Sequence, residues 1–300
     1  MRQSSNPVFK NLDKEYGRYA TFGNNAAGGT FAARQTQQDP FGQAMPGQQA
    51  PQQPEAFSTG RSMTIDDVVI KTAITLGVVT IAGIISYMLV GNSEDSAGNY
   101  SLMMPLALGG GIVGFILAMI AIFTRKTDRP ALVLAYAAAE GVFLGAISFA
   151  FANLSFGEGS TEPGNAIIVQ AIAGTLGVFF GMLVVYKTGA IRVTPKFTKM
   201  IVGAMFGVLA LMIVNLLGMW IGGGEGLGLR SGGPIAIIFS LVCIAIAAFS
   251  FLIDFDQADK LIAAGAPEKT AWSVAFGLTV TLVWLYLEIL RLLSYFMGRD

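Results

Sequence analysis

Seven long apolar stretches follow one polar stretch along this chain. From residue 68 onward, apolar runs alternate with short polar connections, and each run is long enough to cross roughly 30 Å of hydrocarbon. A helix satisfies its own backbone hydrogen bonds in lipid, so the pattern predicts membrane-spanning helices. The predicted spans are 68–90, 102–123, 131–153, 166–186, 200–221, 234–254 and 271–297. The expected fold is therefore all-α, a polytopic membrane protein with seven transmembrane helices.

Short local motifs support the helix starts and indicate how the helices pack. The stretch "TIDD" before the first run is typical of a helix cap, and prolines precede two further runs. Paired glycines four residues apart let two helix backbones approach closely, so they predict tight packing rather than a pore lining. The pairs are Gly110 and Gly114, Gly177 and Gly181, and Gly203 and Gly207.

Residues 1–62 differ from the rest of the chain in composition. They include "QTQQDPFGQAMPGQQAPQQPE", which is rich in Gln, Pro and Gly and has no apolar periodicity. Such a segment cannot bury enough apolar surface to fold. We therefore expect a disordered tail over 1–62 and a seven-helix transmembrane domain over 63–300. The tail lacks the basic start and apolar core of a secretory signal, so the first span is expected to direct insertion.

Basic residues in the connections predict the orientation. The connections after the second, fourth and sixth spans hold nearly all the loop lysines and arginines, whereas the other three hold only Arg230. Basic loops stay in the cytoplasm. We therefore expect a multi-pass protein of the inner (plasma) membrane, with its N-terminus in the cytoplasm and its C-terminus outside.

The composition excludes several classes of function. Hydrophobic residues make up 53% of the chain and charged residues 13%, and the formal net charge of zero gives no reason to expect nucleic acid as a partner. The chain has no histidine and one cysteine, Cys243, so zinc, haem and iron–sulfur sites lack their ligands. A hard cation such as calcium, permeant or bound, is the one metal class left, and no other cofactor is expected.

Ionisable groups inside a span are functional candidates, because each costs about 2.5–3.5 kcal/mol on insertion scales. Glu140 lies about ten residues past Pro130, roughly 15 Å into the third span, among small residues that predict a close helix contact. It could act as a proton-sensitive group or as a protonated packing contact. Lys71 lies one turn into the first span and is expected to reach back to the membrane interface.

The last two spans carry the remaining acids. Glu288 is followed one turn later by Arg291, and such a pair could neutralise itself without any function. The same helix face continues through Thr281 and Trp284, however, which favours the bundle interior. Asp254 directly follows the sixth apolar run and is expected to be drawn into the bundle. Asp256 and Asp259, a little further on, are interpreted as cytoplasmic loop charges.

Together these features resemble the Bax inhibitor-1 / YccA family, and its actinobacterial branch most of all. The resemblance is carried by seven spans, "AEGVFLG" in the third, "IDFDQ" closing the sixth, "WLYLEILRLL" in the seventh and the start "SSNPVFKNL". It covers roughly residues 65–297. It implies six helices around a central C-terminal helix, and a pH-sensitive calcium leak or, in other members, a cytoprotective regulator or an inhibitor of a membrane protease.

The resemblance also implies a pH sensor made of two facing aspartates on the last two helices. Asp254 matches the first, and Glu288 stands where the family has the second. The stretch between them is about ten residues longer than the usual spacing, so Glu140 or a water molecule is an alternative partner for Glu288. We assign Asp254, Glu288, Glu140 and Arg291 to sensing and gating, with Asp254 and Glu288 as candidate calcium ligands.

Four functions compete for this pattern. Two acids close together in a poorly solvated bundle cannot both ionise easily, so shared protons would control a cation path. Alternatively, the protein conducts nothing and binds a membrane protease or another membrane protein through its glycine-lined faces and its tail. An intramembrane aspartyl protease is disfavoured because its glycine–aspartate motif is missing, so we expect no enzyme. A proton-coupled transporter would show repeated halves, and none is evident.

Overall fold

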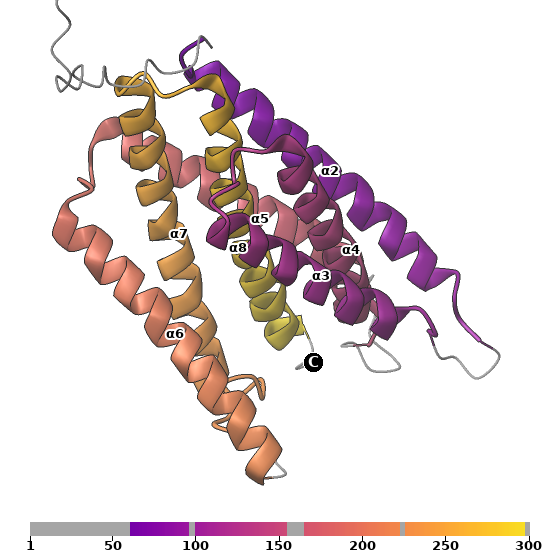
Figure 1. Cartoon of the computed structure of the whole chain (residues 1–300). Coiled ribbons are helices and arrows are strands. Elements are labelled where there is room, and N and C mark those ends of the chain that lie inside the picture. The colour runs from indigo at the N-terminus through magenta and orange to yellow at the C-terminus, as the bar shows by residue number, and fades with distance from the viewer. Residues whose placement is uncertain (1–60, 96–99, 155–164, 223–225, 298–300) are drawn as a thin grey trace, which may run out of the picture. The chain divides into compact units, whose positions relative to one another are not determined.

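Seven long helices make up the chain over the residues that the computed structural model describes, which are 61–95, 100–154, 165–222 and 226–297 (Figure 1). They are α2 (Ile65–Gly91), α3 (Met103–Phe123), α4 (Pro130–Leu154), α5 (Asn165–Thr188), α6 (Pro195–Gly222), α7 (Pro234–Ala263) and α8 (Ala271–Met297), with a 3-10 turn, η1 (Glu268–Thr270), before α8. All seven are long and apolar enough to cross a membrane. The predicted all-α polytopic membrane fold is confirmed, whereas the tail predicted over 1–62 lies outside the described residues except for its last two.

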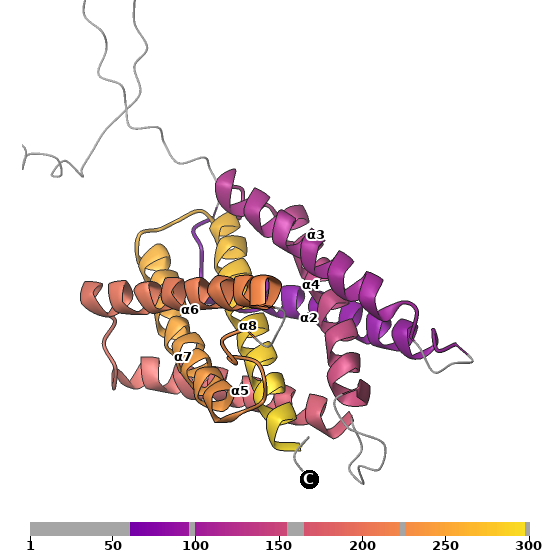
Figure 2. The ribbon, with the colours of Figure 1, turned by 90° about the horizontal axis from the view of Figure 1, so that it is seen from below.

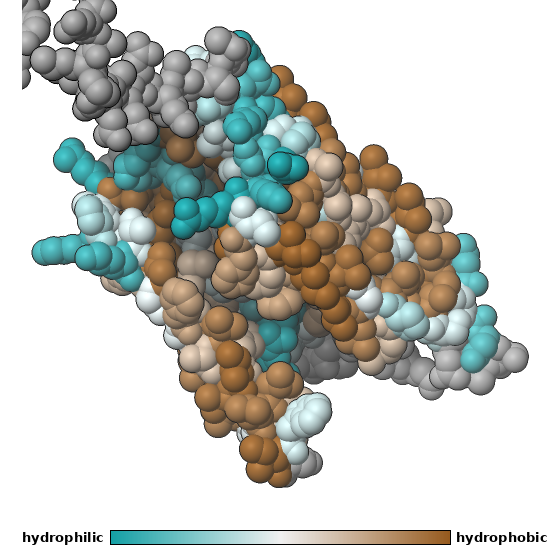
Figure 3. Space-filling model, in the orientation of Figure 1, coloured by the Kyte–Doolittle hydropathy of each residue, from teal (hydrophilic) through white to brown (hydrophobic). Residues whose placement is uncertain are grey.

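Helix α8 is the central element of this bundle. It packs against α2, α4, α5 and α7, and a larger share of it is buried than of any other described span (Figures 1 and 2). Helix α3 packs mainly on α4, and α6 mainly on α7. The expectation of a central C-terminal helix is therefore confirmed. The outer helices turn apolar side chains outward, as Figure 3 shows, which suits contact with lipid.

The predicted helix starts are also confirmed. Thr64 caps α2: its side chain accepts a hydrogen bond from the Asp67 backbone N–H, and the Asp67 carboxylate accepts one from the Thr64 backbone N–H at 2.9 Å. This is the reciprocal capping box that "TIDD" predicts. Helices α4 and α7 begin at Pro130 and Pro234, as predicted, since the missing N–H of proline is not needed in the first turn. Helix α6 also begins at a proline, Pro195, five residues before its predicted start at residue 200.

The predicted end of the sixth span is wrong by about nine residues. The apolar run stops at Asp254, but α7 continues to Ala263. Asp256 forms an ion pair with Lys260 one turn later, and Asp259 accepts a hydrogen bond of 2.8 Å from the Tyr186 hydroxyl of α5. Neither aspartate is therefore a loop charge. A helix does not stop where hydrophobicity stops, because polar side chains extend it equally well once they can pair or reach water.

The connections that hold most of the bases meet at one end of the bundle, which we call the basic end. It comprises the connections 124–129, 189–194 and 264–270. The start of α2 is fastened there, since the Met63 N–H donates to the Ala266 carbonyl and the Lys71 Nζ donates to the Glu268 carbonyl at 2.9 Å and carboxylate at 3.1 Å. Lys71 is 8% exposed, and its ammonium group reaches back to this end of the bundle, as expected, where it forms an ion pair with Glu268. The assignment of this end to the cytoplasm stays a prediction.

Glycines set the spacing of α2, α3 and α4. A Cβ atom built on Gly145 of α4 would lie 2.2 Å from the Gly83 carbonyl oxygen of α2, and one on Gly110 of α3 would lie 2.7 Å from the Phe143 N of α4. The packing predicted for Gly110 and Gly114 is therefore confirmed. The prediction is wrong for the other two pairs, because a Cβ there would meet nothing within 4 Å among the described residues. These are Gly177 and Gly181 of α5, and Gly203 and Gly207 of α6.

Candidate functional site

The carboxylate of Glu288 lies inside the bundle on the central helix. The residue is 2% exposed. Arg291 Nη1, one turn along α8, donates to its Oε1 at 2.7 Å, and Ser240 Oγ of α7 donates to its Oε2 at 3.4 Å. The side chain of Arg291 is also largely buried, at 13% exposed. Arg291 thus neutralises Glu288 on the same helix, and Ser240 adds a contact from a second helix. A pair that faced lipid would not make this second contact.

Asp254 also faces the interface between α7 and α8. Thr281 Oγ1 of α8 donates to its Oδ2 at 2.9 Å, and Thr281 is 8% exposed. Gly277, one turn before Thr281, also lies beside this carboxylate, since a Cβ built there would be in ordinary contact with Asp254 Oδ1, at 3.9 Å. The polar face predicted for α8 therefore does point into the bundle, with Thr281 serving one acid and Glu288 being the other.

The two acids lie at different levels of that interface and do not touch. Ser240, which contacts Glu288, lies 14 residues from Asp254 on α7, and Thr281, which contacts Asp254, lies seven residues from Glu288 on α8. The two levels are therefore about 10 to 20 Å apart along the helices. The side chains are too short to close that distance. The facing pair implied by the family resemblance is therefore absent in this conformation. Glu288 is paired instead with the arginine one turn further along its own helix.

Glu140 lies on the other side of the bundle, between α3 and α4. A Cβ built on Gly114 of α3 would be 3.0 Å from its Oε1, and its carboxyl group interacts with the hydroxyl of Tyr136 one turn earlier. The Tyr136 ring packs edge-on against Phe276 of α8, with 4.9 Å between ring centroids. Glu140 thus reaches the central helix through Tyr136, near the level of Asp254, rather than by contact with Glu288.

The described residues do not form a closed metal site. They contain no group of three or more His, Cys, Asp or Glu side chains placed to hold one ion. Calcium takes six to eight oxygen ligands at about 2.3–2.6 Å, so the separated carboxylates of Asp254 and Glu288 cannot share one calcium ion in this arrangement.

A cleft of about 500 Å³ borders Glu288 between α6 and α8. Apolar side chains of α6 form one wall, while Trp284, Glu288 and Arg291 of α8 and Arg230 of the α6–α7 connection form the other. Sequence reasoning missed Ser240 and the role of Arg230. The signal for Arg230 was visible, since it is the only base in the connections at the end opposite the basic end.

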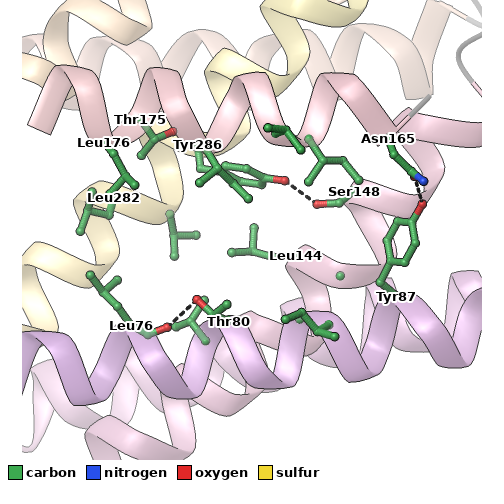
Figure 4. Close-up of a pocket in the computed structure, with 18 of the residues that line it drawn as sticks. Leu76, Thr80, Tyr87, Leu144, Ser148, Asn165, Thr175, Leu176, Leu282 and Tyr286 are labelled. Carbon is green, nitrogen blue, oxygen red and sulfur yellow. Dashed lines mark hydrogen bonds between the residues drawn. The ribbon is translucent and has the colours of Figure 1, made fainter. Parts of the chain in front are cut away.

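A second cavity, of about 480 Å³, lies between α2, α4, α5 and α8 (Figure 4). Its polar groups are already paired: the Ser148 and Tyr286 hydroxyls lie 2.7 Å apart, and the Tyr87 hydroxyl donates to Asn165 Oδ1 at 2.5 Å. None of its lining residues is charged. This cavity is therefore a poor candidate for an ion path.

Comparison with known proteins supports a family assignment. Residues 6–298 match the family model described as Bax inhibitor 1 like, which is nearly the whole chain. The match begins within the segment predicted as a tail, earlier than the residue 65 expected from the motifs. A search of curated proteins found no match.

Proposed function

This chain belongs to the Bax inhibitor 1 like family of membrane proteins, and from that premise we propose that it is a cation leak, with calcium as the permeant ion, controlled by protonation of buried carboxyl groups. The observation that carries the proposal is Glu288, whose carboxylate is buried on the central helix and bound by Arg291 and by Ser240 of α7.

Protonation of Glu288 would change the charge balance of the bundle. While Glu288 is ionised, its charge and that of Arg291 cancel locally. A proton on Glu288 leaves the largely buried guanidinium without its partner, which is strongly unfavourable in a poorly solvated site. The other groups facing Glu288 are Cys243 of α7, Tyr295 of α8 and Arg230 of the α6–α7 connection. The packing of α8 against α7 and α6 is therefore expected to depend on pH.

Asp254 supplies a second polar position on the same interface. Thr281, its partner, precedes Glu288 by about seven residues, or about 10 Å along α8. A conducting path needs sites that attract the ion yet release it, and several separated sites serve this better than one tight site. We infer that Asp254 and Glu288 are successive binding sites for the cation. We also infer that Glu140 influences the packing of α4 against α8 through Tyr136.

Calcium flux through proteoliposomes tests this function. The wild-type chain is expected to pass calcium at rates that differ between about pH 5 and about pH 8, if protonation of buried carboxyl groups controls the leak. Glu288→Gln cannot lose a proton, so its flux should vary several-fold less over the same range. Asp256→Asn, which removes a carboxylate outside this interface, should keep the wild-type profile.

Two results would count against the leak. The absence of calcium flux at any pH from folded, reconstituted protein would remove the proposed function, and an unchanged profile in Glu288→Gln would remove Glu288 from the mechanism. The double variant Glu288→Gln with Arg291→Met removes both charges. It is expected to show the same flat profile, and it keeps the test valid if the single variant reconstitutes poorly.

A second function, a non-conducting regulator that binds a membrane protease or another membrane protein, is favoured by one observation. Gly177 and Gly181 of α5 are exposed and have open space where a side chain would lie, as do Gly203 and Gly207 of α6. Helix faces of this kind accept a partner helix closely. They have no such partner among the described residues.

Crosslinking in membranes distinguishes this second function. If a partner helix packs on α5, Gly177→Leu is expected to reduce a crosslinked heterocomplex several-fold and to leave calcium flux unchanged. Gly109→Leu is the matched control, because Gly109 of α3 is also exposed and has nothing within 4 Å, yet lies outside the G-x-x-x-G pairs. Equal yields of complex from both variants would contradict a docking role for α5.

A further inference from the structure

The connection between α6 and α7 folds back along α6 and carries Arg230 into the cleft beside α8. The Leu227 N–H donates to Asn215 Oδ1 at 2.9 Å, and Arg230 Nη2 contacts the Met212 sulfur at 3.0 Å. Met212 lies about ten residues before the end of α6, which is about 15 Å along the helix. The guanidinium of Arg230 therefore lies beside membrane-spanning residues of α6, well before the point where α6 ends and the connection to α7 begins.

Arg230 has no carboxylate partner among the described ion pairs. Glu288, the acid of the cleft, is paired with Arg291, and the sulfur that Arg230 contacts is a weak acceptor. Two guanidinium groups and one carboxylate leave the cleft with one positive charge in excess.

The facing wall of the cleft is apolar and open. Phe206 and Leu209 of α6 line it and are 67% and 53% exposed. A single occupant that matches both walls needs an anionic group and a long apolar chain. Guanidinium groups bind phosphate through paired, charge-assisted hydrogen bonds, and acyl chains cover apolar helix faces.

We propose that the cleft between α6 and α8 binds an anionic phospholipid, with its phosphate on Arg230 and Arg291 and an acyl chain along α6. Arg230 is the principal ligand, because one guanidinium nitrogen of Arg291 already donates a hydrogen bond to Glu288. The lipid would also fill the space beside α6, whose main protein contact is with α7. This site does not depend on whether the protein conducts ions.

Lipid-dependent unfolding of the full-length protein in detergent tests the site. Phosphatidylglycerol is expected to raise the midpoint of thermal unfolding of the wild-type chain, whereas phosphatidylcholine and inorganic phosphate are expected to have little effect. Arg230→Gln should weaken the response to phosphatidylglycerol at least about tenfold in lipid concentration, as loss of a charge-assisted hydrogen bond requires. Arg192→Gln, at an exposed arginine of the basic end, should respond as the wild type does.

The remaining outcomes contradict the proposal. An undiminished response in Arg230→Gln would place the lipid elsewhere. An equal response to phosphatidylcholine would show that the site does not recognise the negative charge of the lipid headgroup. An equal response to inorganic phosphate would identify a free anion as the ligand. Arg230→Lys keeps the charge but loses the paired geometry, so it should respond between the wild type and Arg230→Gln even if the glutamine variant folds poorly.

Discussion

Replacing Glu288 with glutamine is expected to lower the free energy of unfolding by about 3–5 kcal/mol, the range found when one partner of a buried ion pair is removed. Arg291 would keep its charge with its side chain only 13% exposed, and the amide would offer it a weaker acceptor. Ser240 would lose a charged acceptor as well. Unfolding in mixed micelles, followed by circular dichroism at one pH above neutrality, measures the change.

Two controls separate the buried charge from the substitution itself. Glu288→Gln combined with Arg291→Met should recover most of the lost stability, because a buried pair can be replaced by neutral side chains with little net change. Asp256→Asn breaks the more exposed pair with Lys260 and should cost no more than about 1 kcal/mol. A double variant as unstable as the single one would show that Arg291 is not the source of the instability.

Replacing Gly145 with valine is expected to destabilise the protein by about 3 kcal/mol, the upper part of the usual range for overpacking. Its Cβ would lie 2.2 Å from the Gly83 carbonyl oxygen and 2.7 Å from the Ser86 Cβ, so α2 and α4 would have to separate. That movement would also break the 2.7 Å hydrogen bond from Ser86 Oγ to the Val142 carbonyl. The same unfolding measurement applies.

Gly177→Val is the matched comparison for this prediction. A Cβ at Gly177 of α5 meets nothing within 4 Å, so only helix propensity changes, by less than about 1 kcal/mol. If both valine variants were equally stable, the close approach of α2 and α4 would not limit stability. If both were equally unstable, glycine itself, and not its position, would matter.

The number of spans and most of their bounds could be predicted because the bilayer imposes length and hydropathy directly. The end of α7 could not, since Asp256 and Asp259 are polar residues that a helix tolerates outside the hydrocarbon. The sequence also could not predict which glycine pairs pack against a neighbouring helix. Gly110 and Gly203 sit in similar local sequence, and only the rotation of each helix decides which one meets a neighbour.

The candidate acids could be chosen from the sequence because a charge inside an apolar run is rare and unfavourable. Their partners could not. The register of α7 against α8 brings Thr281 to Asp254 and Ser240 to Glu288, and the folded-back connection brings Arg230 to the cleft. Local sequence encodes neither arrangement. The partner of Lys71 could not be predicted either, since Glu268 lies almost 200 residues further along the chain.

The central position of α8 affects how the protein is made. Ribosomes synthesise this helix after the other six described spans, so those six enter the membrane before the element that α2, α4, α5 and α7 all pack against exists. Until then, the surfaces meant for α8 have only lipid or each other to contact. Premature termination before α8 would leave α2, α3 and α4 packed on one another but would expose the surfaces that α8 covers, and such fragments should be recognised and degraded as unassembled chains.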